Sequence, residues 1–190
     1  DCVELINQLG LGPCHIVGLS MGGFVAMRIA ARNSELLKSL ILLETSAEPE
    51  PNKIKYGLLR TITKLFGVSA VVNKVMPILF GNSFLHDPDR RDLVHEWRNE
   101  VLSNRKTITK AVKGVIDREG ILNELGNIHA PTLVIVGDED VATPAEKAKN
   151  IKLKIPQARL VVIKKAGHSS VIEEPLQVID VIEVFLNGVH

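Results

Sequence analysis

The sequence predicts an α/β fold in which a parallel sheet is covered on both faces by helices. Three observations predict it. Short apolar runs alternate with helical patterns at both ends of the chain. These runs are apolar at consecutive positions, as in strands buried on both faces. A helix-rich block interrupts the alternation. The apolar runs on its two sides predict about four strands. We divide the 190 residues into a core, residues 1–47 and 128–190, and an inserted helical cap, residues 48–127.

The core begins with an amphipathic helix over residues 1–9, which a glycine-rich turn and a proline end. Residues 14–18 are a short apolar run of the buried-strand type. Residues 24–32 contain helix-forming Ala, Met and Arg, with apolar residues three and four positions apart. A second buried strand is expected at residues 39–43. The predicted order is therefore helix, strand, helix, strand.

The inserted block carries helical patterns and no strand pattern. Two helices are expected over residues 53–66 and 69–80, with a glycine between them. Asp87 and Pro88 supply the N-cap and the first turn of a third helix. A fourth helix follows, and Gly120 is expected to close it.

Strand patterns return after the insertion, at residues 131–137 and 159–163. Between them, residues 143–146 read Thr-Pro-Ala-Glu, which matches a capping box with a first-turn proline. A last amphipathic helix is expected over residues 175–186. The alternation of strands and helices predicts the α/β sheet.

The composition favours a small-molecule partner. Lys and Arg number 23 against 22 Asp and Glu, so the net charge offers no field that would draw the whole protein onto nucleic acid or anionic lipid. The sequence contains two cysteines, which do not form a disulfide framework, and this low number fits a reducing compartment. No apolar run approaches the roughly 18 residues of a membrane span, and no signal segment opens the chain. We therefore expect a cytoplasmic protein, and the oligomeric state stays open.

Residues 18–22 read Gly-Leu-Ser-Met-Gly and match G-x-S-x-G between a predicted strand and a predicted helix. This is the context of a nucleophile elbow, in which a sharp turn exposes the Ser20 hydroxyl. Gly18 and Gly22 would leave room for neighbouring backbone, and the Met21 amide would face a developing oxyanion. A glycine-rich turn with an incidental serine is the alternative, and the flanking strand and helix argue against it.

Together with two later stretches, this motif resembles the α/β-hydrolase family. The stretches are residues 18–23, 131–144 and 166–169, the last reading Ala-Gly-His-Ser. The family's catalytic triad runs Ser, Asp or Glu, then His along the chain, and this sequence keeps that order. The elbow Gly-Leu-Ser-Met-Gly-Gly and the Asp-Val-Ala-Thr-Pro of residues 140–144 resemble the enol-lactonase and small carboxylesterase branch.

The triad acid must be chosen among Asp138, Glu139 and Asp140. The family pattern G-x-x-D indicates Asp140, whereas Asp138 is the kind of residue that a turn needs for its own backbone bonds. His168 is the candidate base. The other histidines show no spacing typical of a metal site and are assigned to packing or solvent; they are His15, His86, His95, His129 and His190. Neither a metal nor a cofactor is expected.

The resemblance implies acyl transfer from a small-molecule ester or lactone. His168 would take the proton of Ser20, Asp140 would orient the imidazole, and the Met21 N–H would stabilise the oxyanion. Cofactor-free haloperoxidases, C–C hydrolases and related lyases share this triad. A non-catalytic ligand-binding member of the fold is a further alternative.

The family's sheet has eight strands, and the four counted here match its last four. The resemblance therefore implies a fragment that lacks the N-terminal part of the fold, including the second oxyanion donor. We expect an exposed apolar sheet edge beside Ile16 and Val17 and poor activity of this chain by itself.

The inserted block resembles the family's cap. Its lysines and arginine, Lys53, Lys55, Arg60 and Lys64, are assigned to a polar, solvated face. Its large apolar residues could line an acyl pocket or pack helix on helix, and the sequence leaves both open: Leu58, Leu59, Phe66, Val72, Met76, Leu79, Phe80 and Trp97.

Overall fold

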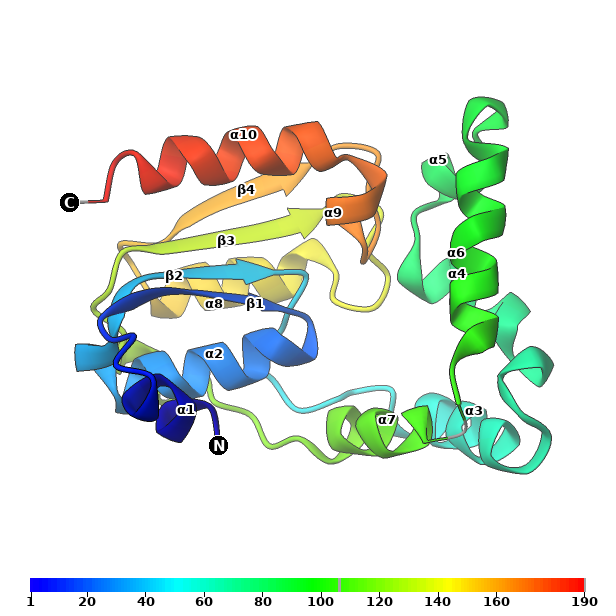
Figure 1. The fold of residues 1–190 in the computed structure, drawn as a ribbon, viewed down its shortest axis with the longest axis horizontal. Helices are drawn as coiled ribbons and strands as arrows, with labels where there is room; N and C mark the ends of the chain where they lie inside the picture. The colour runs from blue at the N-terminus through cyan, green and yellow to red at the C-terminus, as the bar shows by residue number, and fades with distance from the viewer. Residues whose placement is uncertain (106, 190) are drawn as a thin grey trace.

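A computed structural model describes residues 1–105 and 107–189 of the chain. Within them, four parallel strands form one sheet in the order β1-β2-β3-β4 (Figure 1). The predicted α/β fold with a four-stranded parallel sheet is thereby confirmed. The strands are β1 (Cys14–Leu19), β2 (Leu37–Leu43), β3 (Thr132–Gly137) and β4 (Arg159–Ile163).

The two central strands are apolar at consecutive positions because both of their faces are buried. Leu40 and Leu42 of β2 pack into the core on one face of the sheet. Ile41 and Leu43, which alternate with them, pack into a second core on the other face. Each of these four side chains is at most 2% exposed.

Helices cover both faces of the sheet (Figure 1). Phe24 and Met27 of α2, together with Ile151 of α8, fill the first core. Val178 of α10 fills the second. The helices and short 3-10 turns of this part of the chain are α1 (Cys2–Gln8), α2 (Met21–Arg32), η1 (Ser34–Leu36), η4 (Leu125–Asn127), α8 (Ala145–Lys154), α9 (Ser170–Glu173) and α10 (Pro175–Leu186).

The helical insertion lies off the end of the sheet toward which the strands point (Figure 1). The helix expected over residues 69–80 is divided into a 3-10 turn and α4, and α5 is a single turn that the sequence analysis missed. The insertion contains α3 (Lys53–Phe66), η2 (Val68–Ala70), α4 (Val72–Leu79), α5 (Asn82–Leu85), η3 (Pro88–Arg90), α6 (Arg91–Ser103) and α7 (Ile108–Asp117).

The two chain segments that join the insertion to the core are fixed to each other. The Ile121 amide donates to the Ala47 carbonyl at 2.7 Å. Arg118 donates from Nε to the Glu48 carbonyl at 2.9 Å and from Nη1 to Glu50 Oε2 at 2.8 Å. This ion pair is buried, with 6% and 4% of the two side chains exposed.

Arg118 also explains where α7 ends. Gly120 was expected to close this helix, but the structure ends it at Asp117, and Arg118 has extended backbone angles of φ −57° and ψ 137°. The guanidinium reaches back to the first connecting segment and lies 4.3 Å over the Phe24 ring. These contacts of Arg118 with distant parts of the chain therefore end the helix before Gly120 is reached.

The first strand forms an edge of the sheet. Within the described residues, β1 pairs with β2 alone. Val17 is 58% exposed and Leu19 is 41% exposed, in agreement with the apolar edge expected at this place. No helix among the described residues is long and apolar enough to cross a bilayer.

Candidate active site

Ser20 occupies a strained turn between β1 and α2. Its φ is 49°, in the left-handed region that serine rarely adopts. Its amide donates to the Leu43 carbonyl at 2.9 Å, which fixes the turn against β2. A Cβ on Gly18 would lie 2.6 Å from the Gly22 carbonyl oxygen, so this turn requires glycine at position 18.

Of the other two glycines in this turn, Gly22 differs from the expectation. A Cβ on Gly22 would meet no atom within 4 Å, so the lack of a side chain there is not required by packing. A Cβ on Gly23 would lie 2.4 Å from Thr45 Oγ1, and this glycine provides the close approach of α2 to the segment after β2. Met21 is the first residue of α2. Its N–H is one of the first four amides, which have no partner inside the helix.

The three residues singled out from the sequence lie in one hydrogen-bonded chain. His168 Nε2 is 2.8 Å from Ser20 Oγ. His168 Nδ1 is 2.9 Å from Asp140 Oδ2. Asp140 and His168 are buried, with 5% and 8% exposed, and Ser20 is half-buried. The arrangement permits the imidazole to accept the serine proton while the carboxylate holds its other nitrogen.

The Asp140 carboxylate is surrounded by donors. Oδ1 accepts from the amides of Ala142 at 2.8 Å and Thr143 at 2.9 Å, and Oδ2 accepts from the Thr143 hydroxyl at 2.7 Å. Burial by itself raises the pKa of Asp140, but the hydrogen bonds from His168 and Thr143 outweigh it and leave the pKa below its ordinary value. Asp140 is therefore held as a charged acceptor.

The two neighbouring acids have other partners. Asp138 accepts from the Lys165 amide at 2.8 Å. Glu139 accepts from the Ser83 amide at 2.7 Å and the Ser83 hydroxyl at 2.5 Å, which ties the acid loop to α5. Asp140 is thus the one of the three candidates that contacts His168.

Thr143 is a site residue that the sequence analysis assigned wrongly. It was expected to be the cap of a capping box, but α8 begins at Ala145 with Pro144 at its N-cap position, and that cap makes no side-chain hydrogen bond. The Thr143 hydroxyl instead donates to Asp140 and lies 3.3 Å from His168 Nδ1. Thr143 is 6% exposed.

Glu173 holds the loop that carries His168. Its Oε2 accepts from the amides of Gly81 at 2.8 Å and Gly167 at 2.9 Å, and its Oε1 accepts from the Ser169 amide at 3.1 Å. Burial raises the pKa of Glu173, although these amide donors oppose it. A Cβ on Gly167 would lie 2.3 Å from the Gly81 amide nitrogen, so glycine is required where the loop passes the insertion.

Glu44 lies at the end of β2, close to the same site. The residue is fully buried and has a positive φ of 42°. The Ser170 hydroxyl donates to its Oε1 at 2.6 Å, whereas its Oε2 has no hydrogen-bond partner among the described residues. Burial raises the pKa of Glu44 to about 8, and the charges of Asp140 and Glu173 add to this. At neutral pH the carboxyl is therefore mostly protonated.

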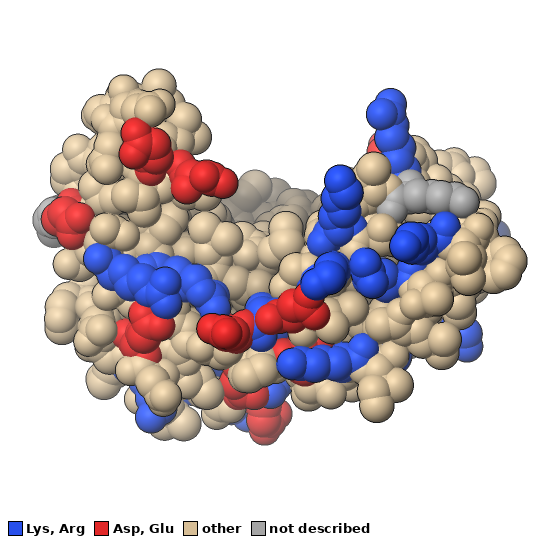
Figure 2. All heavy atoms as spheres, turned by 90° about the horizontal axis from the view of Figure 1, so that it is seen from below, with Lys and Arg blue, Asp and Glu red and all other residues tan. Residues whose placement is uncertain are grey.

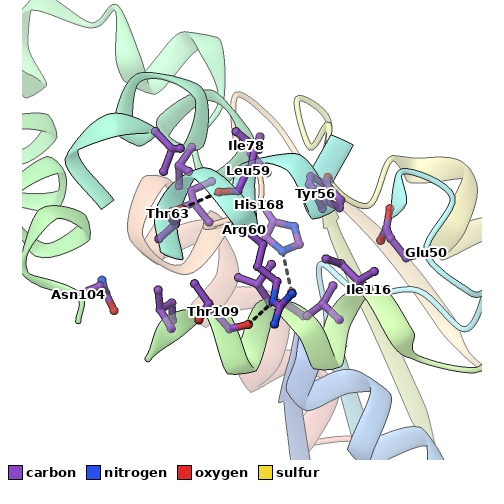
Figure 3. Close-up of a pocket in the computed structure, with 18 of the residues that line it drawn as sticks. Glu50, Tyr56, Leu59, Arg60, Thr63, Ile78, Asn104, Thr109, Ile116 and His168 are labelled. Atoms are coloured by element: carbon purple, nitrogen blue, oxygen red, sulfur yellow. Dashed lines mark hydrogen bonds between the residues drawn. The ribbon is translucent and has the colours of Figure 1, made fainter. Parts of the chain in front are cut away.

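A largely apolar cavity of about 330 Å³ opens beside Ser20 and His168. Its walls come mainly from α3, α4 and α7 of the insertion, as Figure 3 shows for Tyr56, Ile78 and Ile116. The volume lies within the range of small-molecule sites, roughly 300–1,000 Å³.

The apolar residues proposed from the sequence as pocket lining divide into three groups. Leu59 and Leu79 line the cavity. Leu58 and Phe66 are exposed, at 61% and 71%. The remaining four pack into a cluster within the insertion: Val72, Met76, Phe80 and Trp97.

Among the described residues, no group of three or more His, Cys, Asp and Glu side chains could hold a metal ion. Two of the histidines outside the site have polar partners. His15 Nδ1 lies 2.8 Å from Ser39 Oγ, and His86 Nδ1 lies 3.0 Å from the Asn82 carbonyl. His190 lies outside the described residues.

Comparison with known proteins assigns the fold to a family. The α/β hydrolase fold family matches residues 1–175, which is most of the chain. The chain belongs to the α/β-hydrolase family.

Three known proteins are similar to this α/β-hydrolase. An esterase structure from Thermogutta terrifontis is 31% identical and has a TM-score of 0.87, covering all of this chain and 71% of that one. A RutD protein of Pseudomonas savastanoi pv. phaseolicola, whose name gives carbamate hydrolysis as a proposed activity, is 27% identical over 99% of this chain and 73% of its own length. A pimeloyl-[acyl-carrier protein] methyl ester esterase of Aeromonas hydrophila subsp. hydrophila is 28% identical over 91% of this chain and 70% of its own length.

An enol-lactonase structure from Burkholderia xenovorans shows the same fold at 23% identity, with a TM-score of 0.86 and coverage of 98% of this chain and 70% of that one. The names of the Thermogutta terrifontis esterase and the Aeromonas hydrophila methyl ester esterase agree with the ester-acting enzyme expected from the sequence. The chain spans 70–73% of the length of these four proteins.

Proposed function

We propose that this α/β-hydrolase cleaves a carboxylic ester or lactone of a small molecule through an acyl-enzyme on Ser20. The observation that carries the proposal is the unbroken hydrogen-bonded chain from Ser20 through His168 to Asp140, at 2.8 Å and 2.9 Å, beside an apolar cavity. A buried, oriented imidazole is what a serine needs to become a nucleophile near neutral pH.

The proposed reaction has two halves. Ser20 Oγ attacks the carbonyl carbon while His168 Nε2 accepts its proton, and the Met21 N–H donates to the oxyanion. His168 then gives the proton to the leaving oxygen, and the acyl group remains on Ser20. Water then attacks the acyl carbon while His168 accepts its proton, the bond from that carbon to Ser20 Oγ breaks, and the imidazolium returns the proton to Oγ as the acid leaves. Asp140 accepts from His168 Nδ1 throughout and stabilises the charged imidazolium.

We further propose that residues 48–127 act as a cap that selects the acyl group. The cavity that these helices enclose has walls built largely from Leu, Val and Ile side chains, which favours an uncharged, apolar acyl group over a polar one. A cytoplasmic location is part of the proposal. It is supported by Cys2 and Cys14, neither of which is in a disulfide.

The proposal is tested with p-nitrophenyl esters of increasing acyl length. We expect hydrolysis at the low rate anticipated for this chain by itself, and we expect Ser20→Ala to lower kcat by about a thousandfold or more. A fluorophosphonate probe should label the wild-type chain on Ser20, and mass spectrometry after rapid quenching should find the acyl group there. A folded sample that neither labels nor turns over any ester or lactone would refute the hydrolase.

A further inference from the structure

Helix α3 has two apolar faces, and one of them is exposed to water. Tyr56, Leu59 and Thr63 face the cavity beside Ser20 (Figure 3). At 3.6 residues per turn, residues 54, 58, 61 and 65 form a stripe on the opposite side of the helix. Ile54 is 91% exposed and Leu58 is 61% exposed.

The stripe continues to Leu65, which is 62% exposed. Phe66, at the end of the helix, is 71% exposed but lies about 100° around the helix from Leu65, outside the stripe. Single exposed apolar residues need no explanation, but large apolar side chains gathered along one exposed helix face do. We call this set, Ile54, Leu58 and Leu65, the exposed stripe.

Positive charge borders the exposed stripe. The sequence of α3 contains four Lys or Arg residues and no Asp or Glu. Lys53 and Lys64 lie along one side of the stripe and Lys55 along the other, as the helical period requires. Figure 2 shows Lys and Arg side chains gathered on the half of the molecule that carries the insertion.

The neighbouring helix α7 adds Lys110 and Lys113, of which Lys113 pairs with Asp117. The sequence analysis had placed the lysines and Arg60 together on a polar, solvated face. The three lysines are exposed, as expected, but they flank an apolar stripe. Arg60 differs from the expectation, because it lines the cavity and donates to the Thr109 carbonyl.

We propose that α3 docks on the surface of a membrane that contains anionic lipid. The exposed stripe enters the boundary between headgroups and acyl chains, and the flanking lysines bind the lipid phosphates. An exposed apolar stripe bordered by lysines is the composition of helices that lie in the plane of a membrane surface. Lysines close to an anionic membrane strengthen binding, because the negative surface potential attracts them.

Docking gives the helix a second role. Its cavity face lies one helix diameter, about 10 Å, from the membrane face. Docking would therefore hold the cavity close to the lipid phase, in which an apolar ester is concentrated. This consequence rests on the proposed function, whereas the docking itself does not.

The test is sedimentation of the full chain with vesicles. We expect binding to vesicles of phosphatidylcholine and phosphatidylglycerol, much weaker binding to phosphatidylcholine alone, and loss of binding in high salt. The pair Ile54→Ser with Leu58→Ser, and separately Lys53→Glu with Lys64→Glu, should each weaken binding by about tenfold or more.

Matched controls lie elsewhere on the molecule. Leu176→Ser removes a 75% exposed leucine from α10, and Lys38→Glu reverses an exposed lysine of β2. Both should bind vesicles as the wild type does. Hydrolysis of a water-soluble ester should be the same in all these variants, and Ser20→Ala should bind vesicles normally, so failure of catalysis and failure of docking are distinguishable.

Three results would overturn the docking proposal. The wild type could fail to bind anionic vesicles. The Ile54 and Leu58 pair could bind them as tightly as the wild type. Finally, sedimentation equilibrium could show a dimer that dissociates in that pair without any vesicle binding, which would make a second copy of this chain the occupant of the exposed stripe.

Discussion

At the scale of single residues, substitution of Thr143 tests how the Asp140 carboxylate is held in place. Thr143→Val keeps the shape of the side chain and removes the donor to Asp140 Oδ2. Because hydrogen bonds to charged groups contribute about 1.5–3 kcal/mol, we expect kcat for an ester to fall roughly tenfold to a hundredfold with little change in KM.

Loss of this donor also raises the pKa of Asp140, which an NMR titration of its carboxyl carbon should detect. Thr61→Val is the control, because Thr61 is exposed and its hydroxyl donates within α3 to the Gly57 carbonyl. An unchanged pKa of Asp140 in Thr143→Val would show that Thr143 does not act through Asp140.

Glu44 gives a prediction about stability and pH. Its pKa is about 8 in the folded chain against an ordinary value of 4.5, so between these values the folded state binds a proton that the unfolded state has lost. The contribution of Glu44 is therefore fully present below about pH 4.5 and is lost as the pH rises toward 8, by up to about 1.4 kcal/mol per pH unit.

Glu44→Gln removes this titration. Urea unfolding at pH 5 and pH 8 should show that the variant gains free energy of unfolding relative to the wild type at the higher pH. A difference between the two proteins that does not change with pH would contradict the raised pKa.

The positions of Ser20 and His168 could be predicted because short motifs at strand ends mark them. Thr143 could not, because its spacing to Glu146 matches a capping box equally well and only the fold shows that its hydroxyl faces Asp140. Glu44 and Glu173 carry no local signal. Ser170 is 126 residues from Glu44, and the contact that joins Glu173 to the insertion is with Gly81, which is 92 residues away.

At the scale of elements, the buried pair of Arg118 and Glu50 should dominate the attachment of the insertion. Arg118→Met leaves the Glu50 carboxylate buried without its cation, and removal of one partner of such a pair costs about 3–5 kcal/mol. Urea unfolding should show this loss. Combining it with Glu50→Leu should recover part of the loss, because two apolar residues leave no unpaired charge.

Arg32→Met is the matched control. Arg32 also forms an ion pair, with Glu124, but 55% and 36% of the two side chains are exposed. Water already solvates both charges there, so we expect a much smaller loss of stability. Equal losses in the free energy of unfolding of the two arginine variants would mean that burial does not determine how much the Arg118–Glu50 pair stabilises the fold.

All four strands were predicted to within two residues, whereas the helix ends varied: α3 and α10 have the expected bounds, but α7 ends before the expected glycine. Residues 40–43 of β2 and 133–136 of β3 are apolar at consecutive positions because two cores enclose them, and this pattern is visible in the sequence. The end of α7 depends on partners of Arg118 that lie about 70 residues earlier in the chain. A propensity rule that favours Gly120 cannot detect such contacts.

At the scale of the whole molecule, the free edge of β1 should control self-association of this chain. An unpaired strand with exposed apolar residues can pair with another copy. We expect association that rises with concentration in sedimentation velocity, and we expect Val17→Lys to reduce it without a change in Tm.

Val184→Lys serves as the control, since Val184 on α10 is 58% exposed, as Val17 is. If both substitutions reduce association equally, added charge rather than the strand edge would be responsible. The exposed stripe of α3 lies in a different part of the molecule, so Val17→Lys should leave vesicle binding as it is in the wild type.

The hydrogen bond between Ile121 and Ala47 also bears on how such enzymes diversify. The polypeptide departs from the sheet layer and rejoins it at adjacent points, so everything in between can be lengthened, shortened or swapped by recombination at two neighbouring sites. Ser20, Asp140 and His168 all come from segments of the sheet layer, so such an exchange keeps the three side chains of the proposed triad. The exchanged segment must still supply the two contacts that Gly81 and Ser83 make with the loops of His168 and Asp140.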